Sequence, residues 1–279
     1  MIDGQWGQGI AMWDDVVKRI PILKSLDNNC TMTYSKHHRY EFNPPVSLEY
    51  MEELEKNLGV VFPVELRTLY LEVGNGGAGP DSGLHRIEDL EAYRPHEDWP
   101  GVEYINAAED DGDENVDNRV SGAMAIMDRF YSYQNLIVMN GKDAGKIMAF
   151  IPWDVIGFES DSLVKVYNTW LDRRIGYFSW IKGLVVSGDT IQEIVQAMWD
   201  SERRVSPENA LTHIASLLNF PFSYFPDALN ARSFDRSTEG IERVVIDTET
   251  CRLFDEKLEK YRAEQTSNIF RTAWKFIRG

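Results

Sequence analysis

Two glycine-rich segments have spacings that could bind a nucleotide. Residues 74–79, Gly-Asn-Gly-Gly-Ala-Gly, match the G-x-G-x-x-G pattern of dinucleotide-binding turns. That turn needs a strand before it and a helix after it, so that the pyrophosphate meets helix N–H groups. Here a helical pattern precedes the motif and Pro80 follows it, which favours a helix end. Residues 141–146 lack the length and the Lys-Ser/Thr ending of a P-loop and predict a hairpin turn.

Side chains that bind metals or act as nucleophiles are present but scattered. The histidines form no His-x-x-x-His or His-Glu-x-x-His pair, and there is no Cys-x-x-Cys motif. No Gly-x-Ser-x-Gly elbow occurs, and Cys30 has no base near it in sequence. The sequence therefore predicts no metal, no cofactor and no enzyme. A hydrolase whose acids or histidines converge only in the fold stays an alternative.

Acidic residues are concentrated in one stretch. The formal net charge is −16, from 29 basic and 45 acidic side chains. Residues 81–120 contain 13 acidic and three basic residues, a net charge of −10. The densest run, residues 109–114, does not have the register of a calcium-binding loop. Three interpretations stay open: a solvated loop, a docking surface for a basic protein, or a metal site.

The charge also limits the class of partner. An acidic protein repels the phosphate backbone, which argues against nucleic acid, and it attracts a basic protein. Affinity would require aromatic anchors, although such residues are more often part of a core. The candidate partner-binding residues are Glu97, Asp98, Trp99, Glu103, Tyr104, Glu109, Asp110, Asp111, Asp113, Glu114 and Asp117.

Nothing in the sequence predicts a membrane or secreted protein. No apolar run approaches the roughly 18 to 20 residues that cross a bilayer. The N-terminus lacks a basic segment followed by an apolar one, so a secretory signal is not expected. Cys30 and Cys251 are the only cysteines, which indicates a reducing cytoplasm.

Helical patterns come before the acidic stretch. A short helix is expected over residues 12–20, where Pro21 interrupts it or begins a new turn. Ser47 can cap a helix that Gly59 ends, with apolar residues spaced three and four apart. Pro63 can open a second helix, and the glycines after Val73 end it. These features predict a helical hairpin.

Strands and further helices follow. We expect short strands at residues 84–87, 123–129, 135–139, 146–150 and 155–158, with a helical turn at 88–92. Close spacing favours antiparallel pairing. A helix begins at Asp161 or Ser162, and Thr190 with Glu193 forms a capping-box pattern before another. The remaining helices are expected from Ser206-Pro207 onward and at residues 256–264 and 268–277.

The order of these motifs resembles the SUKH superfamily, whose members include bacterial immunity proteins and Smi/Knr-type fungal cell-wall regulators. Glu55-x-x-Leu58-Gly59-x-x-Phe62-Pro63-x-x-Leu66-x-x-Leu69-Tyr70, followed by Asn75-Gly76-Gly77, is similar to the opening of that family. Residues 136–150 resemble its hairpin, and residues 162–170 resemble its closing helix. The resemblance divides the chain into an N-terminal extension over 1–43, a SUKH-like domain over 44–182 and a helical C-terminal extension over 183–279. That last extension either packs on the same domain or forms a separate one.

The resemblance implies an α+β fold, a small and mainly antiparallel sheet flanked by helices, with helical N- and C-terminal extensions. It implies no catalytic residues. It also implies two functions. The first is a bacterial immunity protein that binds and neutralises a cognate secreted toxin, such as a nuclease with a basic cleft. The second is a non-enzymatic scaffold of the fungal cell-wall-regulator type.

Overall fold

The computed structural model describes residues 6–101, 120–129, 133–151, 154–187, 190–203, 205–219, 235–236, 242–243, 246 and 248–278. The chain forms two compact units. The first contains Met1–Lys24 and Met32–Arg174, and the second contains Ser25–Thr31 and Ile175–Gly279. The chain therefore passes between the units three times.

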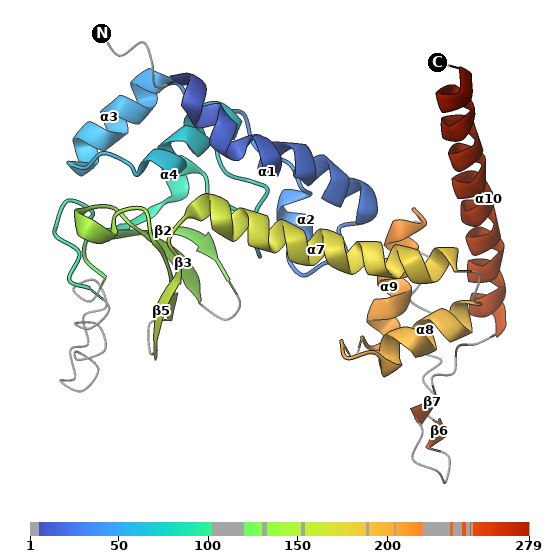
Figure 1. The fold of residues 1–279 in the computed structure, drawn as a ribbon. Helices are drawn as coiled ribbons and strands as arrows, with labels where there is room; N and C mark the ends of the chain where they lie inside the picture. Colours follow the sequence, from blue (N-terminus) through green and yellow to red (C-terminus); the bar gives the residue numbers. More distant parts are fainter. Residues whose placement is uncertain are drawn as a thin grey trace. The chain divides into compact units, whose positions relative to one another are not determined.

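A five-stranded antiparallel sheet organises the first unit, in the order β1-β2-β3-β4-β5. Strands β2, β3 and β5 are labelled in Figure 1. Its strands are β1 Glu91–Tyr93, β2 Ala123–Asp128, β3 Gln134–Val138, β4 Ile147–Ile151 and β5 Asp154–Ser160. Consecutive strands are neighbours, so hairpin connections suffice to build the sheet. The α+β fold class and the four strands expected between residues 123 and 158 are confirmed.

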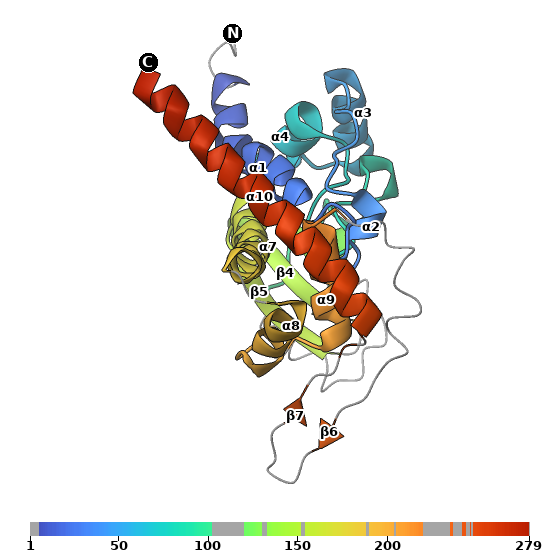
Figure 2. The same cartoon turned by 90° about the vertical axis from the view of Figure 1, so that its right-hand side faces the viewer.

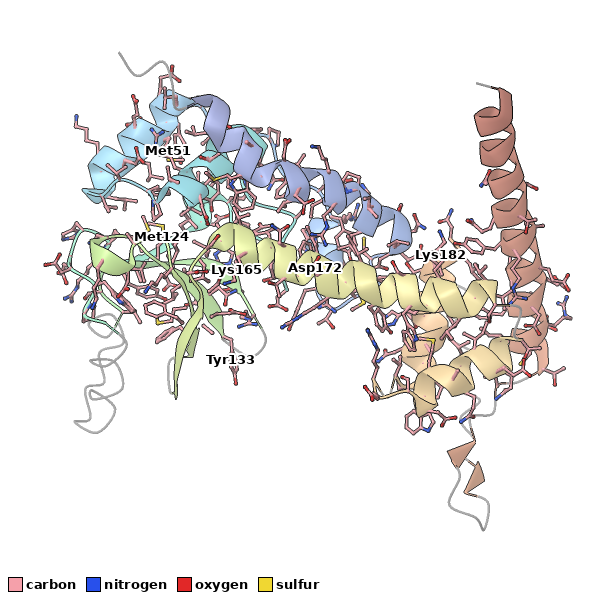
Figure 3. The ribbon with its side chains drawn as sticks, viewed as in Figure 1. Met51, Met124, Tyr133, Lys165, Asp172 and Lys182 are labelled. Atoms are coloured by element: carbon pink, nitrogen blue, oxygen red, sulfur yellow. The ribbon has the colours of Figure 1, made fainter. Side chains whose placement is uncertain are left out.

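Helices lie along one side of this sheet (Figure 1). They are α1 Trp6–Leu26, α2 Ser35–His38, α3 Leu48–Leu58, α4 Val64–Thr68, the π-helical turn η1 Leu69–Val73 and the part of α7 (Leu163–Val186) that belongs to this unit. Met51 on α3 and Met124 on β2, both labelled in Figure 3, are fully buried. The ring of Trp13 meets that of Tyr167 edge-on at 5.2 Å. Apolar side chains from helices and sheet thus share one core.

The helix ends around the hairpin follow the expected capping chemistry. The Ser47 side chain accepts a hydrogen bond from the N–H of Tyr50, and Gly59 ends α3 with φ +70°. A residue with a side chain adopts that left-handed conformation only at a cost, which is why glycine is favoured there. The predicted bounds of this helix are confirmed.

A distant carboxylate caps the long helix α7. Glu65 accepts hydrogen bonds from the N–H groups of Leu163, at 2.6 Å, and Val164, at 3.2 Å. Its other oxygen accepts from the Ser162 hydroxyl at 2.8 Å. A negative charge at a helix N-terminus satisfies free N–H groups and interacts favourably with the helix dipole. Glu65 therefore joins α4 to α7 across 98 residues of sequence.

The expectation that Pro21 interrupts the first helix is wrong, because α1 runs from Trp6 to Leu26 with Pro21 inside it. A proline in a helix interior removes one hydrogen bond and costs about 3 kcal/mol. Buried residues on both sides of the proline offset this cost. Val16, Ile20 and Leu23 are at most 4% exposed.

The prediction for residues 84–92 is also wrong in part. Leu84 forms only isolated bridges, with Gly77 and Met127. Residues Ile87–Asp89 form a 3₁₀ turn, whereas Glu91 and Ala92, expected at the end of the helical turn over 88–92, belong with Tyr93 to the edge strand β1. Pairing with β2 determines this three-residue strand, and a pattern so short cannot specify it locally.

The second unit is helical. It contains the rest of α7, α8 Ile191–Asp200, α9 Pro207–Leu217 and α10 Thr248–Arg278, with a two-stranded ribbon of β6 Asp235–Arg236 and β7 Glu242–Arg243. Thr190 and Glu193 form the predicted capping box. α8 packs against α9 and α10 (Figure 2). The two helices expected at 256–264 and 268–277 are one continuous helix, so that prediction is wrong.

The second unit also includes a short piece of the N-terminal region. Asp27 is fully buried and accepts hydrogen bonds from the N–H of Thr31, at 2.8 Å, and from the Ser216 hydroxyl, at 2.7 Å. Ser216 in turn accepts from the N–H of Asn29 at 2.8 Å. This network of buried, paired polar groups fixes Ser25–Thr31 on α9.

Candidate functional site

The segment after β1 carries the part of the predicted partner-binding region that the structure describes. The side chain of Asn140, at the end of β3, holds it. Asn140 Oδ1 accepts from the N–H of Trp99 at 3.2 Å. Its Nδ2 donates to the carbonyl of Pro95 at 3.0 Å and to the carbonyl of Glu97. One amide thus fixes the backbone at three points.

Gly122 lets this segment approach the sheet. A Cβ atom there would lie 2.7 Å from the carbonyl oxygen of Glu97 and 2.8 Å from the backbone nitrogen of Trp99. Both distances are below ordinary contact, and Gly122 has φ +77°. A side chain at this position would therefore push residues 97–99 away.

Trp99 packs on the sheet through one part of its side chain. It contacts a buried cluster formed by Tyr93, Val120, Ala123, Ala125, Leu136, Met148 and Phe150. Its indole N–H is buried and has no hydrogen-bond partner among the residues that the structure describes. The ring centroid of Trp99 lies 6.4 Å from that of Phe158 on β5, which is 38% exposed. Trp99 is therefore both a core residue and the neighbour of an exposed aromatic ring.

A lysine and a buried carboxylate complete this group. Lys146 Nζ lies 4.8 Å from the Phe158 ring centroid and 2.7 Å from Asp143 Oδ1. Only 10% of the Asp143 side chain is exposed. A hydrogen bond from Lys165 lowers the pKa of Asp161, and the charge of Lys146 adds to that effect.

Exposed apolar side chains lie close by, on the connection between α3 and α4. Val61 is 69% exposed and Val64 is 67% exposed. The connection lies close to the segment after β1, since a Cβ at Gly59 would be 3.5 Å from that of His96. The connection also lies close to the turn between β3 and β4, since a Cβ at Gly145 would be 3.7 Å from that of Pro63. We call residues Glu97, Asp98, Trp99, Asp143, Lys146 and Phe158 the Trp99 surface, with Val61 and Val64 at its rim.

The structure describes three of the predicted residues, which are consecutive in the sequence. Asp98 is exposed, and Glu97 is half-buried with its carboxylate 3.7 Å from Arg94. Trp99 follows them in sequence and packs against the buried cluster of the sheet. The other predicted residues lie outside the described part of the chain: Glu103, Tyr104, Glu109, Asp110, Asp111, Asp113, Glu114 and Asp117.

Sequence reasoning missed Asn140, Lys146 and Phe158. Asn140 and Lys146 were interpreted as parts of a hairpin turn, and Phe158 as part of a strand. A polar residue directly after an apolar strand is a weak signal for a side chain that binds a neighbouring loop. Their proximity to Trp99 depends on tertiary pairing of strands, which no local pattern encodes.

The glycine-rich motif at 74–79 uses its N–H groups inside the fold. The N–H of Gly77 donates to the carbonyl of Leu84 at 2.9 Å, and that of Ala78 donates to the carbonyl of Glu41 at 2.8 Å. Asn75 is buried and donates from Nδ2 to Glu88, and this hydrogen bond lowers the pKa of Glu88. These hydrogen bonds tie the motif to Glu41 and Leu84 within the fold, so these two N–H donors are not available to a phosphate.

Among the residues that the structure describes, no three His, Cys, Asp or Glu side chains are close enough to hold a metal ion. His85 lies 3.2 Å from Asp128, and no third His, Cys, Asp or Glu of the described residues joins this pair to form a metal site. The helices within the described ranges include none that is long and apolar enough to span a membrane.

Asn140 should control how well the surface binds. Asn140→Ala removes the three hydrogen bonds to residues 95–99, so the segment should become more mobile. We expect affinity for a partner that binds there to fall about tenfold, since ordering the segment would then oppose binding. Hydrogen exchange at the amides of residues 96–99 should accelerate. Lys142→Ala, on the same turn, is the control. Unchanged exchange in Asn140→Ala would contradict this role.

Comparison with known proteins identifies the domain that carries this surface. Residues 45–172 match the model of the SMI1/KNR4 family (SUKH-1). No curated protein and no solved structure matched the chain. The matched residues extend from the α3–α4 hairpin through all five strands into α7, the same elements that carried the resemblance in the sequence. Residues 45–172 therefore form a domain of the SUKH superfamily, the one that the SMI1/KNR4 (SUKH-1) model describes.

Proposed function

We propose that this protein is a bacterial immunity protein that binds a cognate secreted toxin and neutralises it by occlusion. The partner is a positively charged protein domain, such as a nuclease, whose cleft must attract phosphate. Proteins of the SUKH family are generally non-catalytic binding proteins, which supports this role. The complex would form in the cytoplasm, where thiols such as those of Cys30 and Cys251 stay reduced.

One observation carries the proposal: acidic residues adjoin exposed apolar and aromatic residues on the family domain. Glu97 and Asp98 belong to the stretch with net charge −10. Phe158, Val61 and Val64 provide exposed apolar surface near them. Protein interfaces combine apolar anchors, which supply affinity, with charges that steer encounter and select the partner. We propose that Glu103, Tyr104, Glu109, Asp110, Asp111, Asp113, Glu114 and Asp117 extend the same surface.

A direct test measures binding of the purified product of the neighbouring gene, and survival of cells that express it. Glu97→Lys with Asp98→Lys should slow association about 10- to 100-fold at low salt, since steering depends on local charge. At high salt the difference should largely disappear because the Debye length falls to about 3 Å at 1 M. The same cells should lose protection.

A charge-matched control separates local from overall electrostatics. Glu259 and Glu264 are exposed on α10 of the second unit, and replacing both by lysine changes the net charge by the same amount. This variant should bind almost as the parent does. Equal slowing in both double variants would contradict the proposed surface. Absence of both binding and protection in the parent would overturn the immunity function.

The second candidate is a non-enzymatic scaffold, and the match to the SMI1/KNR4 model is the observation that favours it. A scaffold would use the same surface without blocking its partner. The two candidates differ in one measurement, the activity of the partner in the saturated complex. An immunity protein abolishes it, and a scaffold leaves it intact.

A further inference from the structure

Lys146 occupies a site with all the features of a receptor for a cation. The Phe158 ring provides a π face at 4.8 Å, within the range of cation–π attraction. Asp143 provides a carboxylate at 2.7 Å that is mostly withdrawn from solvent. Trp99 places a second ring beside Phe158. Together an aromatic face and a partly buried carboxylate bind a flat cation better than either alone.

Lys146 is held only weakly between Phe158 and Asp143. The Lys146 side chain is 36% exposed and is attached to its own turn by a flexible stem of four carbons. It approaches Asp143 from three residues away, and because the Lys146 side chain stays partly exposed, solvent screens part of the attraction between the two charges. Its ammonium is a point charge that interacts with a ring less well than a planar group does. Because its stem is flexible and partly exposed, Lys146 can turn toward solvent when another cation takes its place.

We infer that this site receives an arginine side chain of the partner, which displaces Lys146 and lies between the Phe158 ring and the Asp143 carboxylate. The inference rests on the proposed function, because it names the group by which the basic partner is anchored. An arginine guanidinium stacks on a ring through its plane and donates two parallel hydrogen bonds to a carboxylate. In the free protein Lys146 thus pairs with Asp143, and in the complex the arginine replaces it.

The test compares two synthetic peptides of equal length and charge, ten arginines and ten lysines, titrated calorimetrically into the full-length protein. The parent should bind the arginine peptide about threefold more tightly. Lys146→Ala should increase this preference, because it vacates the site. Lys142→Ala is the matched control: it removes the same charge from the same turn, at an exposed position. It should strengthen binding of both peptides equally.

Phe158→Leu should have the opposite effect to Lys146→Ala on the preference for the arginine peptide. It keeps an apolar side chain on β5 but removes the π face, so the arginine preference should disappear while the lysine peptide binds as before. A thermal unfolding scan checks that this variant is folded. An equal affinity for both peptides in the parent, or equal effects of Lys146→Ala and Lys142→Ala, would overturn the arginine site and leave the proposed function standing. Failure of both peptides to bind at low salt would instead count against the acidic docking surface itself.

Discussion

Replacing Glu65 by alanine is expected to lower the free energy of unfolding by about 2 to 3 kcal/mol. The Glu65 carboxylate accepts three hydrogen bonds at the start of α7, from two backbone N–H groups and the Ser162 hydroxyl. Alanine would leave these donors without their acceptor and remove the favourable charge at the helix terminus. Urea denaturation followed by circular dichroism measures the loss.

Two variants calibrate this result. Glu65→Gln retains the chain length and one acceptor oxygen, so it should lose about half as much free energy. Glu52→Ala on α3 removes an exposed carboxylate and should change stability by less than about 0.5 kcal/mol. The indole N–H of Trp13 donates to the Glu65 backbone carbonyl, which all variants keep. An equal loss in Glu65→Ala and Glu52→Ala would show that α7 does not depend on this distant cap.

Asp27→Ala should have a comparable effect, about 3 kcal/mol, on the second unit. Asp27 and Ser216 are both fully buried, so the hydroxyl of Ser216 and the N–H of Thr31 would lose their acceptor without access to water. A buried donor left without a partner costs more than a typical hydrogen bond contributes. Hydrogen exchange of the α9 amides reports the destabilisation.

A double-mutant cycle gives the sharper result. Ser216→Ala alone removes the donor, and the double variant removes both groups. Coupling between Asp27 and Ser216 should be at least about 1 kcal/mol, because the two contact directly. Additive losses would show that the two side chains act independently and that Ser25–Thr31 is held by other contacts.

The parts of the fold that could be predicted are those with strong local signals. Ser47 and Gly59 mark the ends of α3, and Thr190 with Glu193 marks the start of α8, because caps depend on neighbours within four residues. The strands β2 to β5 are apolar and separated by turn residues. By contrast, α1 continues through Pro21 because distant residues cover its buried face, and β1 exists because β2 provides a partner.

The same distinction applies to the Trp99 surface. Glu97, Asp98 and Trp99 were identified because composition alone marks an acidic stretch that contains aromatic residues. Phe158 is 59 residues from Trp99 and Asn140 is 41 residues from it. Their proximity is produced by the register of β3, β4 and β5, which the hydrophobic pattern allows but does not specify.

The bond between Asp27 and Ser216 has a consequence for synthesis. These residues are 189 positions apart, so a ribosome that adds about 5 to 20 residues per second exposes the aspartate roughly 10 to 40 s before its serine exists. During that interval the first unit can complete its sheet, whereas Ser25–Thr31 must wait for the last third of the chain. Nascent chains released early would therefore lack the partner for this segment, which makes it a candidate site for chaperone binding and for proteolysis.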